Sequence, residues 1–181
     1  MNHDKQYSAA IERLRSPKRL ELLEVERVVD YTLEDIIAQT LLDVGTGSGV
    51  FAEAFSAAGL AVTGIDTNQE MLEVARQFVS TRLFEQAPAE AIPFPDDSFD
   101  IAFMGHVLHE STEPLAVLRE ARRVARQRVV VLEWPWREET MGPPLAHRFQ
   151  PEQVARLAQD AELIGVESAD HAYMTVYRLQ V

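Results

Sequence analysis

The sequence contains no cysteine, so disulfide bonds, thiolate nucleophiles and cysteine-ligated zinc are all excluded. Its apolar runs are short: Val129–Leu132 falls far below the roughly 18 residues of a membrane-spanning helix. The first residues, Met1–Lys5, are polar and lack the apolar segment of a secretory signal. We therefore expect a cytoplasmic protein with no membrane span and no bound metal.

Basic residues are also scarce, with 17 Lys and Arg against 29 Asp and Glu, which gives a formal net charge of −12. A surface of this sign repels phosphate backbones, so a small molecule is a better expected partner than nucleic acid. Five arginines form a local exception and indicate either a solvated helix face or a binding patch; they are Arg119, Arg122, Arg123, Arg126 and Arg128. The sequence is compatible with a monomer or a homodimer.

A chain of 181 residues with 46% hydrophobic composition has the size and core content of one domain. We expect residues 1–181 to form that domain, with an N-terminal helical region at 1–38 and a core at 39–181. Ser16 followed by Pro17 is typical of a helix start, because serine caps the first N–H groups and proline suits the first helical position. One or two amphipathic helices are predicted over residues 16–38.

After residue 38, short segments rich in β-formers alternate with amphipathic helical segments. The predicted strands are Leu41–Val44, Ala61–Ile65, Arg82–Glu85, Asp100–Met104, Arg128–Glu133, Leu163–Ser168 and Tyr173–Leu179. The predicted helices are Val50–Ala58, Asn68–Val79, Glu113–Arg126 and Pro151–Ala161.

This alternation predicts an α/β fold, a Rossmann-like doubly wound sheet of seven mostly parallel strands with helices on both faces. The last two predicted strands are separated by only a few residues, too few for a parallel crossover. We therefore expect them to form an antiparallel hairpin at the sheet edge.

The strongest chemical signal is a glycine loop that joins the first predicted strand to the first helix. It reads Leu-Leu-Asp-Val-Gly-Thr-Gly-Ser-Gly over residues 41–49. Glycines at such a turn let backbone approach a ligand, and N–H groups at the helix start attract polar or anionic groups. The alternative is that these glycines serve only to make a tight turn.

Two acidic residues near the loop refine this interpretation. Asp66 ends the second predicted strand, 21 positions after Gly45, where doubly wound folds place an acceptor for ribose hydroxyls. The dinucleotide pattern Gly-x-Gly-x-x-Gly would need glycine at position 50, which is Val50. Asp43 would repel a pyrophosphate but attract an ammonium group, or it could be a purely structural acceptor for the loop.

Four stretches in this order resemble class I S-adenosylmethionine-dependent methyltransferases, specifically the ubiquinone and menaquinone biosynthesis group. They are the glycine loop at 41–49, the acidic second-strand motif at 64–72, the Ala-Glu-Ala-Ile-Pro-Phe-Pro-Asp-Asp-Ser-Phe-Asp stretch at 89–100, and Met-Gly-His-Val-Leu-His at 104–109. The resemblance covers most of the chain. It implies methyl transfer from S-adenosyl-L-methionine, with S-adenosyl-L-homocysteine as product, to a small-molecule acceptor, for which an aromatic or quinone-like compound is the first expectation.

The resemblance also implies a role for each matching residue. Asp66 would bind the ribose, Thr67 and Met71 would flank the adenine, and Ala89 and Glu90 would line its other side. The methionine part would contact Asp43, Gly45, Thr46, Gly47, Ser48, Gly49, Met104, Gly105 and His106. Position 88 departs from the family, because Pro88 stands where the family usually has Asp or Asn for the adenine amine.

Candidates for the acceptor side follow the fourth and fifth predicted strands. His109 is a candidate proton shuttle, and the alternative is that it packs at the start of a helix. Trp134, Trp136 and His147 are candidate acceptor-pocket residues, since tryptophans at the ligand edge can stack on a flat molecule. The alternative is that the tryptophans fill the space between their loop and the N-terminal helices.

Two other functions remain open from the sequence. An NAD(P)-binding oxidoreductase uses the same sheet, although the glycine spacing and Asp43 disfavour it. A non-catalytic S-adenosylmethionine-binding module is the third hypothesis, because Pro88 breaks the adenine motif and no catalytic base is obvious.

Overall fold

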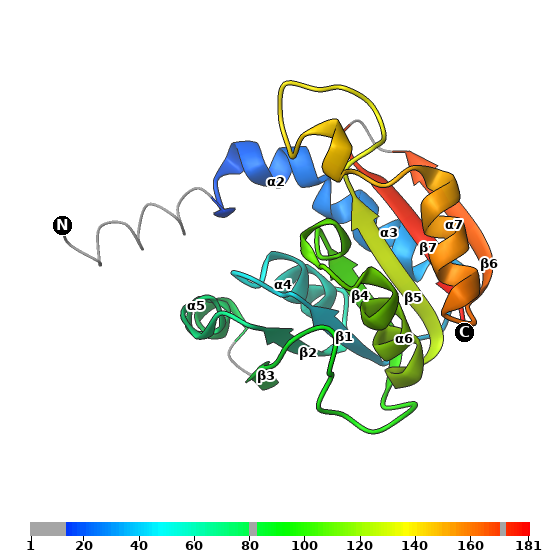
Figure 1. The fold of residues 1–181 in the computed structure, drawn as a ribbon. Helices are drawn as coiled ribbons and strands as arrows, with labels where there is room; N and C mark the ends of the chain where they lie inside the picture. The colour runs from blue at the N-terminus through cyan, green and yellow to red at the C-terminus, as the bar shows by residue number, and fades with distance from the viewer. Residues whose placement is uncertain (1–13, 80–82, 171–172) are drawn as a thin grey trace.

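The computed structural model describes residues 14–79, 83–170 and 173–181, and its centre is a seven-stranded sheet (Figure 1). The strand order is β3-β2-β1-β4-β5-β7-β6. Parallel pairing joins the strands from β3 to β5, and the pairs β5–β7 and β7–β6 are antiparallel. The strands are β1 (Thr40–Val44), β2 (Ala61–Asp66), β3 (Leu83–Gln86), β4 (Phe99–Gly105), β5 (Ala125–Glu133), β6 (Ile164–Asp170) and β7 (Thr175–Gln180).

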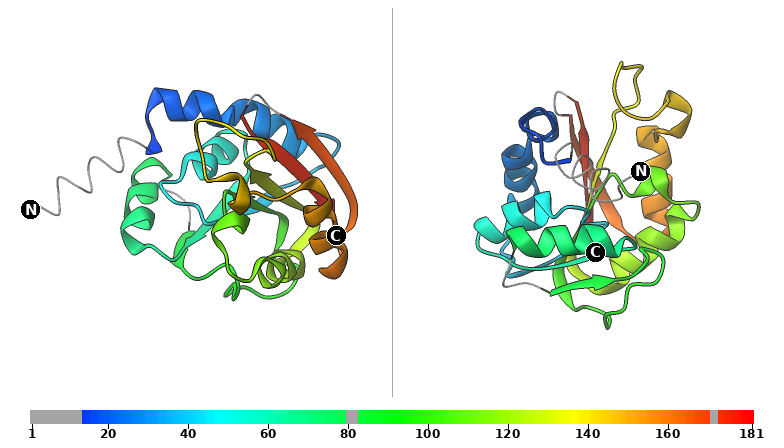
Figure 2. Two further views of the ribbon diagram at one scale, coloured as in Figure 1. Left: turned by 45° about the horizontal axis from the view of Figure 1, so that its top comes forward. Right: turned by 90° about the vertical axis from the view of Figure 1, so that its left-hand side faces the viewer.

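Helices cover both faces of this sheet, as the end-on view in Figure 2 shows. One face carries α2 (Pro17–Leu23), α3 (Val25–Leu33), α4 (Val50–Ala57) and α5 (Gln69–Phe78). The other face carries α6 (Pro114–Val124) and α7 (Pro151–Asp160). Two 3₁₀ turns, η1 (Leu108–Glu110) and η2 (Leu145–His147), follow β4 and β5 along the chain. Among the described residues, no helix combines the length and apolar character needed to cross a bilayer.

The alternation of side chains along the central strands explains the two layers. Leu42, Val44 and Met104 face one apolar cluster with α6 and α7, while Leu41 and Phe103 face a second cluster with the other four helices. Because successive residues of a strand point to opposite faces, a strand covered on both sides is apolar over most of its length. All seven residues of β4 except Gly105 are accordingly buried.

The N-terminal region forms two helices, as expected. The Ser16 hydroxyl accepts a hydrogen bond from the Arg19 N–H and caps α2. Glu24 separates the helices with a left-handed backbone (φ 45°), which turns α3 against α4. Leu22, Leu23, Val28 and Val29 bury the apolar faces.

The predicted fold class is confirmed, including the antiparallel C-terminal hairpin and the N-terminal helices. Several boundaries differ by one to three residues from the prediction. The clearest case is the helix expected over Glu113–Arg126, which ends at Val124, so that β5 begins at Ala125 and not at Arg128. Ala125 pairs with Phe99, so sheet hydrogen bonding overrides helical periodicity there. The predicted start of the third strand, Arg82, lies outside the described residues.

The arginine cluster is not the solvated helix face that the charge pattern suggested. Arg123 donates hydrogen bonds to Glu120, Asp96 and two backbone carbonyls, and Arg126 binds Asp100. The buried Arg128 donates to the carbonyls of Thr32 and Glu34 at 2.7 and 2.9 Å. These guanidinium groups fix loops and the end of α3 to the sheet.

Candidate functional site

A cavity of about 420 Å³ opens where the carboxyl ends of β1, β2 and β4 meet, beneath α2. This is the edge at which doubly wound sheets bind ligands. Most predicted cofactor residues line it: Asp43, Gly45, Thr46, Gly47, Ser48, Asp66, Thr67, Ala89, Glu90, Gly105 and His106. The sequence pattern and the backbone therefore converge on one site.

The glycine loop presents its bare backbone to the cavity. Gly45 and Gly47 both have left-handed backbones (φ 67° and 53°), and a Cβ on Gly47 would meet no atom within 4 Å. A Cβ on Gly45 would instead lie 2.5 Å from Val107 Cγ2. Gly47 thus leaves room for a ligand, whereas Gly45 leaves room for the chain that follows β4.

The loop N–H groups are used differently from expectation. The Thr46 N–H donates to the Ile65 carbonyl, the Gly47 N–H to Asp66, and the Gly49 N–H to the Thr46 carbonyl. These three donors hold the loop in shape and are not directed at a ligand. What these three residues leave to a ligand is their open Cα surface, because their N–H groups are already hydrogen-bonded within the protein.

Asp66 is held at the end of β2 by two backbone donors. Its Oδ2 accepts from the Gly47 N–H and its Oδ1 from the Asn68 N–H, both at 2.8 Å. A carboxylate oxygen accepts more than one hydrogen bond, so each oxygen keeps capacity for another donor. Two adjacent hydroxyl groups in the cavity would match this fixed pair of acceptors.

Asp43 lies deeper, at the end of β1, and is buried. The Thr46 hydroxyl donates to its Oδ2 at 2.7 Å. Burial raises the pKa of Asp43 to about 7; the Thr46 hydrogen bond opposes this and the charge of Asp66 adds to it. Asp43 is thus both a structural acceptor for the loop and a cavity-lining group that a cationic ligand would ionise.

The opposite wall of the cavity comes from the segment after β3. Ala89 and Glu90 line it, beside Thr67 at the end of β2, and the Ser111 hydroxyl donates to Glu90 Oε1 at 2.6 Å. Pro88 supplies no side-chain acceptor here, and its carbonyl accepts the Ala91 N–H at 3.3 Å. Polar recognition on this wall therefore rests on Glu90 and backbone groups.

Three predicted residues do not line the cavity. Gly49 caps α4, and a Cβ there would lie 2.8 Å from Ala75 Cβ, so this glycine serves helix packing. Met104 is fully buried in the apolar core beneath β4. Met71 lies in the first turn of α5, outside the cavity wall. Met104 is absent from the cavity wall because the alternation of side chains along β4 points it toward the face covered by α6 and α7.

His106 lies immediately after β4 with a left-handed backbone (φ 62°), a conformation that is uncommon for residues other than glycine. Its N–H donates to the Leu132 carbonyl at 2.8 Å. Burial, with the charges of Arg19 and His109, lowers the pKa of His106 to about 3. A neutral imidazole therefore lines the cavity.

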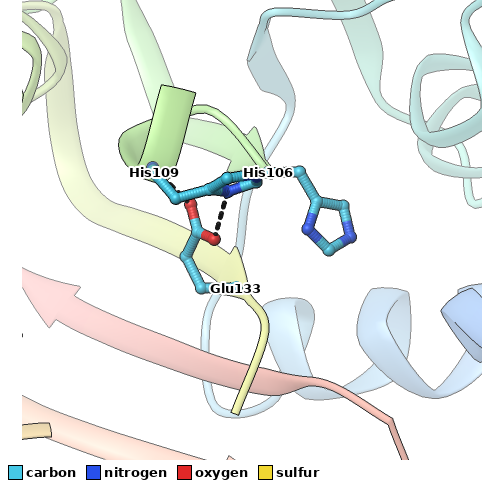
Figure 3. A group of neighbouring side chains, drawn as sticks. All are labelled: His106, His109 and Glu133. Carbon is cyan, nitrogen blue, oxygen red and sulfur yellow. Dashed lines mark hydrogen bonds and ion pairs between the residues drawn. The ribbon is translucent and has the colours of Figure 1, made fainter. Parts of the chain in front are cut away.

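His109 lies beside His106 on η1 and contacts Glu133, the last residue of β5 (Figure 3). His109 Nδ1 is 2.7 Å from Glu133 Oε2. Glu133 was missing from the sequence-based site, although an acidic residue at the carboxyl end of a predicted strand is the signal that could have found it.

The three residues predicted for the acceptor pocket, Trp134, Trp136 and His147, do not line the cavity. Trp134 is buried, its ring stands 5.2 Å from that of His106, and a Cβ on Gly142 would lie 2.6 Å from it. Trp134 thus fills the space under its loop, as the alternative interpretation held. Trp136 is 39% exposed and His147 lies on the exposed η2 turn. Neither lines the cavity.

The N-terminal helix contributes residues that sequence reasoning did not assign to the site. Leu14, Arg19 and Leu23 line the cavity, and Arg15 donates to the Ser48 carbonyl at 2.8 Å. Other lining residues that were not predicted are Val50, Phe51, Ala87, Val107, Glu110 and Ser111. The residues from the N-terminal region could be assigned to the site only once the structure showed that this region packs beside the glycine loop.

Residues 42–132 match the family model described as "Methyltransferase domain". This match spans half of the chain.

The chain belongs to the methyltransferase domain family.

Two curated relatives and one solved structure illustrate the similarity. An uncharacterized methyltransferase, YcgJ of Bacillus subtilis, is 39% identical over 92 residues, covering 48% of this chain and 36% of the relative. The demethylmenaquinone methyltransferase of Thermotoga maritima is 34% identical over 128 residues, covering 68% and 52%. A crystal structure of a SAM-dependent methyltransferase from Aquifex aeolicus superposes with a TM-score of 0.77 at 27% identity, covering 96% and 97%.

The expected resemblance to class I S-adenosylmethionine-dependent methyltransferases is therefore confirmed at the level of family and fold. The chain spans only about a third to a half of the length of these two curated relatives.

Proposed function

We propose that this chain transfers the methyl group of S-adenosylmethionine to a small-molecule acceptor. The observation that carries the proposal is the position of Asp66. Its carboxylate is fixed by two backbone N–H groups beside the open Gly47 surface, in the one cavity shared by all four family motifs. Ribose hydroxyls are the ligand groups that match such an acceptor.

The remaining lining residues fit the same cofactor. Asp66 would hold the ribose, and Thr67, Ala89 and Glu90 would surround the adenine. The bare backbone at Gly47 would accommodate the methionine part, with its ammonium group near Asp43. Burial disfavours the charge of Asp43, so an ammonium group beside it would offset that cost.

When bound, S-adenosylmethionine supplies an already activated methyl group for in-line displacement. The task of the chain is then to align the acceptor and exclude water. Leu14, Leu23 and Phe51 bring apolar surface to the cavity and Arg19 closes its α2 side. The neutral His106 marks the end of the cavity where an acceptor would approach.

An aromatic or quinone-like acceptor is the finer part of the proposal. The Thermotoga maritima relative, named for demethylmenaquinone, supports it. The exposed Trp136 and His147 near the β5 exit are available for such a ring. The net charge of −12, together with the internal bonds of Arg123, Arg126 and Arg128, favours a small acceptor over nucleic acid.

Isothermal titration with S-adenosylhomocysteine and NADH tests the cofactor. We expect binding of the first and none of the second; the reverse would revive the oxidoreductase hypothesis, which the family match disfavours. Asp66→Ala should weaken S-adenosylhomocysteine binding by roughly 1–3 kcal/mol. Asp160→Ala, an exposed change on α7, is the control. Equal binding by the Asp66 variant would remove the ribose assignment.

Methyl transfer separates an enzyme from the third hypothesis, a non-catalytic cofactor-binding module. Formation of S-adenosylhomocysteine is measured with an acceptor panel that includes hydroquinones and amines. Transfer to any acceptor excludes the non-catalytic module.

A further inference from the structure

Three side chains gather where β4 and β5 leave the sheet: His106, His109 and Glu133 (Figure 3). His106 lines the cavity, His109 lies on the η1 turn behind it, and Glu133 ends β5. The binding of the cofactor itself requires neither His109 nor Glu133. Their arrangement therefore needs a separate explanation.

Glu133 is buried, and both of its oxygens are committed to His109. Oε2 lies 2.7 Å from the ring Nδ1, and Oε1 accepts the His109 backbone N–H at 3.2 Å. A carboxylate at Nδ1 favours the tautomer that carries its proton there, which leaves the lone pair on Nε2. The pair of contacts fixes both the orientation and the tautomer of the ring.

The groups around His109 make its ring a stronger base. Burial lowers the pKa of His109, but the hydrogen bond and charge of Glu133, with the charge of Glu110, outweigh burial and the charge of Arg148. The pKa of His109 is therefore raised above its ordinary 6.5. His109 keeps 10% of its side chain exposed, so it is not sealed in the core.

His106, unlike His109, has no hydrogen-bond partner within the described part of the chain that would orient its ring or favour its protonation. Both of its ring nitrogens are buried and have no hydrogen-bond partner among the described residues. Its ring stands edge-on to that of His109, with centroids 5.9 Å apart. Buried polar atoms without a partner are costly, and a polar group of a ligand at this end of the cavity would satisfy one of them.

We propose that His109, oriented by Glu133, accepts the proton that the methyl acceptor loses, while His106 hydrogen-bonds the reacting group of the acceptor. This inference rests on the proposed methyl transfer and narrows the acceptor to one with an acidic hydroxyl, such as a phenol or hydroquinone. A nucleophile without a removable proton, such as a thioether, would have no use for the pair.

The electron and proton balance is complete without another reactant. The O–H bond of the acceptor breaks and its proton moves to His109 Nε2. The electron pair left on the acceptor, at oxygen or at a conjugated ring carbon, forms the new bond to the methyl carbon. The sulfur–methyl bond breaks, and its electron pair stays on sulfur, which becomes neutral. The imidazolium, paired with the Glu133 carboxylate, returns its proton to water.

A divalent cation is the competing explanation, because one ligand atom of each residue lies within 4.8 Å of the others. The 2.7 Å contact between Nδ1 and Oε2 is the length of a charge-assisted hydrogen bond. His109 Nδ1 and Glu133 Oε2, two of the atoms that could bind a cation, are thus already bound to each other. The geometry favours a proton-accepting pair over a metal site.

The first experiment needs no acceptor. Long-range ¹H–¹⁵N spectra of the imidazoles, recorded on the full chain from pH 4 to 9, report tautomer and pKa. We expect the Nδ1–H tautomer for His109 with a pKa above 6.5, and a lower pKa in Glu133→Gln. The exposed Glu152→Gln on α7 is the matched control and should leave the titration unchanged. An Nε2–H tautomer, or equal pKa values in Glu133→Gln and the wild type, would overturn the proposal.

The second experiment measures S-adenosylhomocysteine formation with two probes. One is 1,4-naphthohydroquinone, which carries acidic hydroxyl groups, and the other is histamine, an amine without a hydroxyl group. His109→Asn should lower kcat for the hydroquinone at least 100-fold, since general-base catalysis contributes about 10²–10⁴-fold. Glu133→Asp should retain more activity than Glu133→Gln, and the low-pH limb of kcat should follow the pKa of His109. Unchanged kcat in His109→Asn overturns the proposal; if neither probe is methylated, the tautomer and pKa measurement alone decides.

Two further readouts separate the possible failures. The Kd for S-adenosylhomocysteine should stay within twofold in His109→Asn and Glu133→Gln; wild-type protein that does not bind it refutes the proposed function instead. Zn²⁺ is titrated alone by calorimetry. Stoichiometric binding that removes the His109 Nδ1–H signal would replace the proton-accepting pair with a metal site.

Discussion

Gly49 and Ala75 touch where α4 and α5 meet, and the contact leaves no space for a side chain on the glycine. A Cβ on Gly49 would lie 2.8 Å from the Cβ and 3.1 Å from the Cα of Ala75. The third glycine of the loop therefore sets the distance between two helices, while Gly47 leaves space for the ligand. The two roles predict different outcomes on substitution.

Gly49→Ala should lower the free energy of unfolding by about 2–4 kcal/mol, because the left-handed backbone (φ 77°) and the overlap with Ala75 both oppose a methyl group. Gly59→Ala is the matched control: its φ is 98°, but a Cβ there meets no atom within 4 Å. Urea denaturation measures both. Equal losses in the two variants would show that the contact with Ala75 contributes nothing.

Asp43 should make the cofactor-free protein less stable as pH rises. Its pKa in the folded state, about 7, exceeds the ordinary 3.8, so the folded state binds more protons across this window. Stability should therefore fall from about pH 4 to pH 7, by on the order of 1–3 kcal/mol for this group. Asp43→Asn should flatten that part of the urea-midpoint profile. A variant whose profile runs parallel to the wild type would contradict the assignment.

Asp100 should have the opposite pH dependence. Burial raises its pKa, but donors from Gln39, Thr40 and Arg126 outweigh burial and hold the pKa of Asp100 well below its ordinary 3.8. The contribution of Asp100 to the free energy of unfolding is complete well above pH 3.8, and it is lost as the pH falls toward the pKa of the folded state.

Asp100→Asn should therefore cost on the order of 2 kcal/mol at pH 7 and measurably less near pH 3, where part of this contribution is already lost. Thermal and urea unfolding at both pH values measure the difference. Asp96→Asn is the control, because that carboxylate also pairs with an arginine but is 73% exposed, so the change should be small. A loss at pH 3 as large as at pH 7 would sink the electrostatic explanation.

Arg148 should hold the loop after β5 closed. Its buried guanidinium donates to the carbonyls of Pro135, Arg137, Met141 and Pro143 at 2.8–3.1 Å. Arg148→Met should speed trypsin cleavage after Arg137 by about tenfold or more, equivalent to about 1.4 kcal/mol of easier local opening. Arg156→Met, on the exposed surface of α7, should leave the rate unchanged. Equal cleavage in both variants would mean that other contacts hold the loop.

Local patterns predicted the sheet and most of the cofactor cavity from the sequence. Strand alternation, the glycine loop and Asp66 are encoded within a few residues, so Gly47 and Asp66 could be placed together before any tertiary contact was known. The same patterns located the C-terminal hairpin, because a short connection permits only antiparallel pairing.

Tertiary relationships account for what the sequence did not reveal. Gly49 matches the loop pattern, but the helix it contacts is 26 positions away at Ala75. Glu133 and His109 lie 24 residues apart on different elements, and nothing local pairs them. Trp134 could be a pocket or a core residue until the position of Gly142 was known. In the first two cases the deciding neighbour is distant in sequence, and in the third it lies eight positions away, on the loop after β5.

The loop from Pro135 to Pro143 is held by the guanidinium of Arg148, whose four hydrogen bonds all go to main-chain carbonyl oxygens. Every amino acid carries that oxygen, so substitutions that keep Arg148 and Gly142 should preserve the path of the loop. Evolution or protein engineering can thus change the side chains on the surface of this loop, and with them the range of substrates, while the backbone of the loop and the rest of the fold stay the same.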